Sequence, residues 1–376
     1  MDIHECRNEA VKALRQCCTP HGIYASGGAG GYTQVWARDS VITFLGTSLI
    51  KDDAFRKCFR KSLDTLAKYQ SELGQIPNAV DLYDKKRKKQ VTFATIDSSL
   101  WYVIGEHVYA RNYGDKRFLI KNKRNIERAL LWVKYQDTGE DKLPEQQPTS
   151  DWQDAFPHKY GHVLNTQALY YFALKLHGKN KEANEVRDAV HGKIKKEINF
   201  FCNKGYYLPW MWKNHNGAKE REEWFDSLGN LLAIIFGLAD NNKSKKIINY
   251  IKKNKINKPY PVKALYPAIK PTDKEWKHYF SKCDARKPYN YLNGGIWPFI
   301  GGFYVAALVK LGMIKKAQEE LQKLAEANYN FKKKRYDFFE WVDGRNGEFR
   351  EGYYQAWSIG MFVFAHECVK RGKLII

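Results

Sequence analysis

Residues 298–328, PFIGGFYVAALVKLGMIKKAQEELQKLAEAN, contain the pattern that decides the fold. The first half, from Phe299 to Leu308, carries almost no charge. After a short turn at Gly312, residues 313–328 are rich in lysine, and their apolar side chains recur every three or four positions. An apolar helix is typical of a protein interior, and an amphipathic helix is typical of a surface. The stretch therefore predicts two antiparallel helices, one inner and one outer.

The same pattern recurs along the whole chain, whereas the alternation expected of strands is scarce. Because no segment resembles a linker, we predict a single domain over residues 1–376. Twelve helices are expected near residues 3–18, 38–50, 53–72, 95–113, 116–136, 163–178, 180–199, 226–239, 243–254, 298–312, 313–328 and 355–372.

The connections between these helices alternate between tight turns and long segments. The long segments span residues 19–37, 73–94, 137–162, 200–225, 255–297 and 329–354. Loops of this length are usually functional. If consecutive helices run antiparallel, all six long loops lie at one end of the molecule. We therefore predict an all-α fold, an (α/α)6 barrel in which six inner helices ring an axis. An open α-solenoid is the alternative, disfavoured because no fixed repeat period is present.

Composition and charge limit the partners of the chain. No stretch approaches the roughly 20 apolar residues that a membrane span needs, and the first ten residues do not resemble a signal peptide. Seven cysteines without a C-x-x-C pair suit a reducing cytoplasm. The net charge of +22 is spread over most amphipathic segments, and its densest run, at 85–89, is expected at a loop tip. Such a distribution favours solubility over nucleic-acid binding. Homo-oligomer formation stays open.

Aromatic side chains are concentrated in the long loops. Trp101 and Trp357 begin inner helices, and Trp132 alone lies inside an outer helix. Large flat rings at loop positions can cap a core, but they also line pockets for sugars. The other eight of the eleven tryptophans, all in long loops, are Trp36, Trp152, Trp210, Trp212, Trp224, Trp276, Trp297 and Trp341.

Carboxylates lie beside these aromatic residues. Glycoside hydrolysis needs one carboxylic acid and one carboxylate, and the loops offer several candidates. Helix N-capping is the simpler interpretation for Asp97 and Asp226. The glycine run at 27–31 lacks the Lys and Ser/Thr of a phosphate loop, and the histidines show no ligand spacing, so we predict neither a cofactor nor a metal. The candidate acids are Asp39, Asp97, Asp151, Asp154, Asp226 and Glu340.

Several blocks in these loops resemble the neutral and alkaline invertases, glycoside hydrolase family 100. The most specific is FEWVDG followed by YQAWSIG, which is similar to P-E-Y-Y-D-G followed by Y-Q-T-W-S-I in that family. The blocks occur in the family's order, from about residue 35 to 365. They are VWARDS at 35–40, IDSSLW at 96–101, GHVLNTQALYYFA at 161–173, SLGNL at 227–231, GGIWP at 294–298, FEWVDG at 339–344 and YQAWSIG at 354–360.

The resemblance implies an (α/α)6 barrel and an inverting hydrolase of sucrose. The family's catalytic Asp stands eight residues before the His of its G-H-P block, which here is Asp154, and its second carboxylate matches Glu340. Asp39 and Gln355 fall on positions that hold the innermost sugar. An inverting pair should lie about 6.5–9.5 Å apart. The full set of candidate substrate-binding residues is Trp36, Arg38, Asp39, Asp97, Trp101, Asp151, Trp152, His162, Gln167, Trp224, Asp226, Trp297, Gln355 and Trp357.

The chain departs from the family around the acid, where it has SDWQDAF in place of M-I-D-R-R-M-G. The stretch at 150–152 is similar to the S-G-W-D of trehalase-like and glucosidase barrels, which leaves Asp151 as a rival acid. An α-glucosidase, debranching or trehalase-like hydrolase is therefore an alternative. A sugar epimerase or isomerase with His162 as base is another, and so is a non-catalytic binder of carbohydrate or polyanion.

Overall fold

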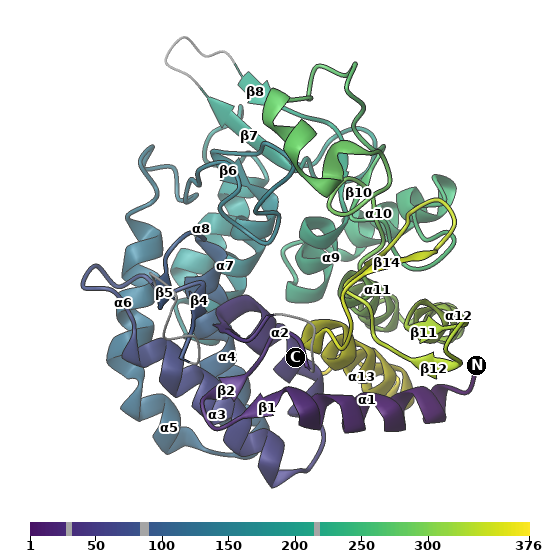
Figure 1. Ribbon diagram of the computed structural model, residues 1–376. Coiled ribbons are helices and arrows are strands. Elements are labelled where there is room, and N and C mark those ends of the chain that lie inside the picture. The colour runs from purple at the N-terminus through teal and green to yellow at the C-terminus, as the bar shows by residue number, and fades with distance from the viewer. Residues whose placement is uncertain (28–31, 83–89, 214–218) are drawn as a thin grey trace.

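The computed structural model describes residues 1–27, 32–82, 90–213 and 219–376, and within them the chain is mainly helical (Figure 1). The helices are α1 (Ile3–Cys17), α2 (Ala37–Thr47), α3 (Asp53–Lys68), α4 (Asp97–Tyr113), α5 (Lys116–Lys121), α6 (Lys123–Lys134), α7 (Leu164–Leu176), α8 (Asn180–Val190), α9 (Ser227–Phe236), α10 (Asn241–Lys253), α11 (Pro298–Lys310), α12 (Ile314–Ala327) and α13 (Ala356–Arg371), with 3-10 turns η2 (His278–Lys282) and η3 (Asp284–Arg286). None of the helices in these ranges is long and apolar enough to cross a membrane.

Six inner helices form a closed ring around the barrel axis (Figure 1). Each inner helix packs against the next in the order α2, α4, α7, α9, α11 and α13. The last of them, α13, packs against α2 and closes the ring. Every residue of α2 and α9 is buried, whereas α3 is amphipathic and buries one stripe that includes Phe55, Phe59 and Leu63. The ring confirms the predicted (α/α)6 barrel. It also excludes the open solenoid, because a solenoid would leave its first and last helices without this contact.

Most helix boundaries lie within four residues of the prediction, and two larger differences have a tertiary cause. The helix expected over 116–136 is divided into α5 and α6 at Asn122, whose side-chain amide donates to both carboxylate oxygens of the buried Glu106 at 3.0 and 3.1 Å. The helix expected over 180–199 ends at Val190, because His191 pairs with Asn199 in a β-bridge. In both places a tertiary contact overrides the local periodicity.

Gly46 of α2 and Gly360 of α13 allow a close contact between these two helices of the ring. A Cβ atom built on Gly46 would lie 1.9 Å from the carbonyl oxygen of Gly360, and one built on Gly360 would lie 2.4 Å from the carbonyl oxygen of Thr43. Both obstacles are backbone atoms, which cannot rotate away. The seam where the ring closes therefore depends on the absence of side chains at two positions.

Replacing Gly46 with Ala should destabilise the fold by about 1–3 kcal/mol, because separating two packed helices costs more than the better helix propensity of Ala returns. Urea unfolding followed by circular dichroism measures this change. Lys57→Ala, on the exposed side of α3, serves as the control and should change stability by less than about 0.5 kcal/mol. Equal midpoints for the two variants would contradict the packing argument.

The long loops carry the short strands. These are β1 (Cys18–Thr19), β2 (Gly22–Ile23), β3 (Val35–Trp36), β4 (Ala79–Val80), β5 (Val91–Thr92), β6 (His162–Val163), β7 (Trp210–Lys213), β8 (Lys219–Arg221), β9 (Phe225–Asp226), β10 (Leu265–Tyr266), β11 (Tyr329–Asn330), β12 (Arg335–Tyr336), β13 (Trp341–Val342) and β14 (Phe349–Glu351).

Backbone hydrogen bonds join each long loop to the next around the barrel mouth. Pairs β3–β4, β6–β7 and β9–β10 make three of these links. The amide of Ile96 donates to the carbonyl of Ser150 at 2.9 Å, and Ile296 forms a bridge with Val342. A bridge between Ser26 and Gln355 closes the circle. The predicted gathering of the six long loops at one end is thereby confirmed.

Candidate active site

A cavity of about 60 Å³ opens at this end and contains both predicted catalytic carboxylates. Asp154 and Glu340 are 186 residues apart in sequence (340 minus 154), yet they line the same pit. Four of the six long loops, together with the first turns of α2 and α13, supply its walls. The lining residues are Ala25, Tyr32, Trp36, Arg38, Asp39, Trp152, Asp154, Tyr291, Trp297, Glu340, Gln355 and Trp357.

The start of α2 supplies a buried cation to this cavity. Arg38 donates from Nη1 to Asp97 at 3.0 Å, and its Nε lies 4.0 Å from Asp39. All three side chains are buried. Burial raises the pKa of Asp39 to about 6, although the charge of Arg38 acts in the opposite direction. Losing one partner of such a buried pair costs about 3–5 kcal/mol, so Asp97 holds Arg38 in place.

Asp154 projects from the loop that follows α6. Part of its side chain is open to solvent, but its carboxyl group lies deep enough among protein atoms for desolvation to raise its pKa. The charge of Arg38 lowers this pKa, and the charges of Asp97 and Asp151 raise it. The net effect is a raised pKa, which favours the protonated form that a general acid requires.

Asp151, the rival acid, lies outside the cavity. Its carboxylate is fully buried and forms an ion pair with Lys159 at 2.9 Å. Gln146 donates to the same oxygen at 3.2 Å, and the ammonium of Lys159 also donates to Gln153 at 2.6 Å. Nearby Asp226 has a pKa that burial raises to about 6 against the charge of Lys159. This buried network supports the loop that carries Asp154, but it does not face the pit.

Glu340 is positioned by an irregular hairpin. The register of β13 and β14 shifts between Trp341 and Val342, directly after Glu340. Gly352, with φ of +74°, passes so close that a Cβ atom there would lie 2.7 Å from the Glu340 Cβ. A β-bulge redirects neighbouring side chains, and only glycine fits this approach without strain. Glu340 itself is 8% exposed, at the wall of the pit.

A cluster of aromatic rings forms another wall of the cavity. Trp357 stacks on Phe299 with ring centroids 4.2 Å apart, and Trp297 meets Trp152 edge-on at 5.7 Å. Tyr291 packs on Trp297 at 5.1 Å. Burial raises the pKa of Tyr291, and the charges of Glu340 and Asp154 raise it further. Tyr291 therefore stays protonated close to both carboxylates and can donate a hydrogen bond there.

Several buried N–H groups in this wall have no hydrogen-bond acceptor among the described residues. They are Arg38 Nε, Trp152 Nε1, Gln355 Nε2 and Trp357 Nε1. Buried donors without partners are rare in native proteins, and they are typical of sites that bind a polar ligand. Four such donors beside flat aromatic rings suit the hydroxyl oxygens and the apolar faces of a sugar.

Seven of the fourteen residues expected to bind substrate line the cavity: Trp36, Arg38, Asp39, Trp152, Trp297, Gln355 and Trp357. Tyr32 and Tyr291 also line it and were not predicted. Of the seven residues that do not line it, Asp97, Asp151 and Asp226 are the buried acids described above, and Trp224 is buried beside Glu222, to which its indole donates.

The remaining three have other partners. Trp101 packs in the core between Phe236 and Phe303, because it lies a full turn inside α4. His162 contacts Asp141 at 3.2 Å, and Gln167 donates to the carbonyl of Pro144 at 2.8 Å.

Two sequence features lie wholly or mostly outside the described residues. The lysine run at 85–89 is one of them, and the glycine run at 27–31, apart from its first residue, is the other. All seven cysteines are free.

Family comparisons match two parts of the chain. The family model for alkaline and neutral invertase matches residues 199–372, and the model for amylo-alpha-1,6-glucosidase matches residues 12–139. The mitochondrial neutral/alkaline invertase 1 of Oryza sativa subsp. japonica is 25% identical over 342 residues, which cover 75% of this chain and 53% of the relative. The chain is similar to the alkaline and neutral invertases. The resemblance inferred from the sequence blocks is thus confirmed.

Further comparisons extend this relationship. The chloroplastic alkaline/neutral invertase E of Arabidopsis thaliana is 24% identical over 329 residues, covering 72% of this chain and 51% of the relative. The chain therefore spans about half the length of these invertases. A GH63 mannosylglycerate hydrolase from Thermus thermophilus has a similar fold, with a TM-score of 0.68 and 13% identity over 95% of this chain and 99% of its own. The compartments of these relatives differ, so the cytoplasm stays a prediction.

Proposed function

We propose that the chain is an inverting glycoside hydrolase that acts on a small neutral sugar such as sucrose, with Asp154 as general acid and Glu340 as general base. The observation that carries this proposal is the meeting of these two carboxylates in one cavity that is walled by tryptophan rings and contains unpaired N–H donors. The similarity to invertases supports the same reaction class.

In the proposed mechanism water displaces the leaving group in one step. Asp154 donates its proton to the glycosidic oxygen as the bond from that oxygen to the anomeric carbon breaks. Glu340 removes a proton from a water molecule that attacks the opposite face of the same carbon. Asp154 ends ionised and Glu340 ends protonated, and exchange with solvent restores both. The raised pKa of Asp154 favours the protonated form of the acid before the reaction.

The charges in the cavity favour a neutral substrate. Its lining includes three acids, Asp39, Asp154 and Glu340, and one cation, Arg38. That guanidinium already pairs with Asp97. A carboxylate or phosphate on the substrate would therefore meet repulsion without a free cation to balance it. This argument separates the chain from hydrolases of acidic glycosides such as a mannosylglycerate.

Hydrolysis of α-1,6-glucosides is the second candidate function, because the amylo-alpha-1,6-glucosidase model matches residues 12–139, which include Trp36, Arg38 and Asp39. The epimerase or isomerase alternative loses support. The base that it needs, His162, lies outside the cavity and contacts Asp141.

Incubation with sucrose, trehalose, maltose and isomaltose, followed by proton NMR, tests the function directly. We expect two monosaccharides from at least one of these sugars, sucrose above all. In spectra taken before mutarotation, the newly formed anomeric centre should have the configuration opposite to that of the substrate. An excess of isomaltose cleavage over sucrose cleavage would favour the second candidate instead.

Retained configuration would contradict the one-step displacement, and the absence of any released monosaccharide would contradict hydrolysis. Binding without turnover would support the non-catalytic alternative. Conversion of one monosaccharide into another, with no second sugar released, would identify an isomerase.

A further inference from the structure

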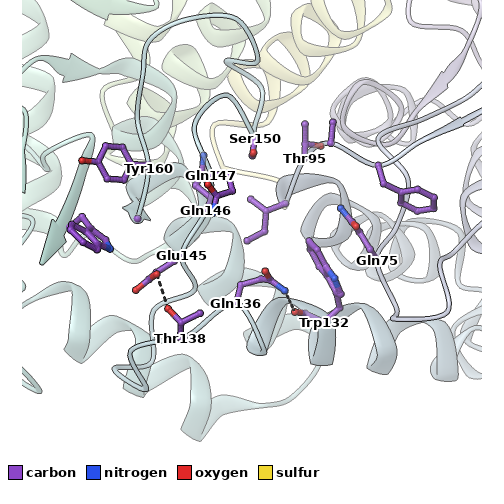
Figure 2. Close-up of a pocket in the computed structure, with 15 residues that line it drawn as sticks. Gln75, Thr95, Trp132, Gln136, Thr138, Glu145, Gln146, Gln147, Ser150 and Tyr160 are labelled. Carbon is purple, nitrogen blue, oxygen red and sulfur yellow. Dashed lines mark hydrogen bonds between the residues drawn. The ribbon is translucent and has the colours of Figure 1, made fainter. Parts of the chain in front are cut away.

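A second cavity, of about 460 Å³, lies at the loop end and shares no lining residue with the cavity of Asp154 and Glu340 (Figure 2). Its walls come from residues 75 and 93–96, the end of α6 with the turn that follows, residues 145–161, and Trp212 of β7. Its volume is within the range of about 300–1,000 Å³ that small-molecule sites occupy. Nothing in the proposed hydrolysis uses this space.

Aromatic faces are accessible in this cavity. Trp132, the tryptophan that the sequence places inside an outer helix, is only partly buried, and so are Tyr160 and Trp212. Phe93 is 42% exposed. In Figure 2 Trp132 and Tyr160 lie on opposite sides of the cavity. A tryptophan that served only to fill the core would turn its ring inward, as Trp101 does.

The polar groups of the cavity are almost all uncharged. The side-chain amides of Gln75 and Gln147 form no hydrogen bond with any described residue, so they are available to a ligand. The hydroxyl groups of Thr95 and Ser150 also belong to lining residues, but that of Thr95 bonds to the Ser98 hydroxyl at 2.5 Å and that of Ser150 donates to the Pro148 carbonyl at 3.3 Å. The one carboxylate, Glu145, accepts a hydrogen bond from Thr138 at 2.8 Å. Amides and hydroxyls both donate and accept, which matches the hydroxyl groups of a sugar.

The absence of cations from this lining is informative because the chain carries a net charge of +22. No lysine, arginine or histidine is among the described residues that line the cavity. The neighbouring cavity, which shares Gln147 and Tyr160 with it, is lined by three cations, Arg221, Lys274 and Lys277, and by two carboxylates, Glu220 and Glu222, so its lining carries an excess of positive charge. An anion would therefore prefer the neighbouring cavity, and a neutral polyol would prefer this one.

We infer that this second cavity is a binding site for a neutral sugar, with the Trp132 ring as its stacking surface and the amides of Gln75 and Gln147 as its hydrogen-bonding groups. The inference goes beyond the proposed function, because it concerns binding at a place where no bond is broken. The cavity also contacts the loop of the general acid. Its wall includes Ser150 and Gln146, and Gln146 donates to Asp151, three residues before Asp154.

Fluorine NMR of protein labelled with 5-fluorotryptophan tests this site apart from catalysis. The probe is D-glucose, which contains no glycosidic bond, and D-gluconate is the anionic comparison. We expect the signals of Trp132 and Trp212 to shift and saturate with glucose but not with gluconate. Trp36, Trp152, Trp297 and Trp357 report separately on the first cavity. Single Trp→Phe variants assign each signal.

Substitutions then test the contacts. Trp132→Ala should weaken glucose binding, followed at Trp212, about tenfold or more, the usual loss for a central aromatic contact. Gln147→Ala should weaken it about 2- to 10-fold. Trp276→Ala is the matched control, because this partly buried tryptophan lines neither cavity, and it should leave the affinity unchanged.

Two outcomes would overturn the inference. In one, the fluorine signals of Trp132 and Trp212 do not shift when glucose is added, and in the other they shift equally with gluconate. Failure of the proposed hydrolysis would instead appear as an absence of sugar release, with glucose binding intact.

Discussion

Asp154→Asn should lower kcat for the natural substrate by about 10²–10⁴-fold, the usual contribution of a positioned acid. The amide that replaces the carboxyl group cannot protonate the glycosidic oxygen. A second substrate identifies the role of Asp154. The leaving group of an aryl glycoside of the same sugar needs no proton, so the substitution should lower kcat for that substrate far less than for the natural one. In the wild-type protein kcat/KM should fall as pH rises through the raised pKa of Asp154, because the ionised form cannot donate. This alkaline decline should disappear in the variant.

Asp151→Asn is the discriminating control for this assignment. Asp151 is fully buried and paired with Lys159, so the substitution should lower the free energy of unfolding by about 3–5 kcal/mol. At temperatures where the variant stays folded, the natural and aryl substrates should be affected equally. If Asp151→Asn instead retains hydrolysis of the aryl glycoside while Asp154→Asn loses it, Asp151 is the general acid and Asp154 is not.

Helical periodicity was sufficient to predict the barrel. In α11 and α12 the sequence alternates between an apolar helix and a lysine-rich one, and this contrast separates inner from outer positions before any contact is known. The alternation of loop lengths then places the long loops at one end. Neither signal predicts the break at Asn122, because that break depends on Glu106, which lies 16 residues away in sequence on another helix.

The short strands were missed for a related reason. Most contain two residues, as in β3 and β4, and two residues cannot display an alternating pattern. Their pairing joins loops that are far apart in sequence, so the partner of each strand is a property of the closed ring. The same pairing brings Ile296 to Val342 and thereby fixes the segment that follows Glu340.

The site was predicted best where a residue begins an inner helix or lies close to one. Trp36 and Arg38 at α2 and Gln355 at α13 all reach the cavity, because helix starts face the mouth. Asp97 also begins an inner helix, but it is turned toward Arg38 and supports that side chain from behind. Sequence spacing cannot distinguish a residue that lines the cavity from one that holds such a residue in position. Tyr291 was missed because one tyrosine in a loop of more than forty residues carries no local signal.

Glu340→Gln should reduce kcat about as strongly as Asp154→Asn, by about 10²–10⁴-fold. Unlike the effect of Asp154→Asn, this reduction should not become smaller when the substrate has a better leaving group. Without a base, water is not activated, so an aryl glycoside should be hydrolysed as poorly as the natural substrate. Azide is a nucleophile that needs no deprotonation. In the space left by the neutral amide it should attack the anomeric carbon and yield a glycosyl azide of inverted configuration.

Measured together, the two variants test whether the carboxylates act on opposite faces of one sugar. Glu348→Gln, at an exposed position on the same hairpin as Glu340, is the matched control and should retain wild-type turnover and produce no azide adduct. A glycosyl azide of retained configuration from Glu340→Gln would mean that azide enters from the face of the departing group. In that case Glu340 would be the acid–base residue of a retaining enzyme, because azide then displaces a covalent intermediate that is held on the opposite face of the sugar. An inverted azide from Glu340→Gln, together with aryl-glycoside activity in Asp154→Asn, would require the base and the acid to face each other across the pit.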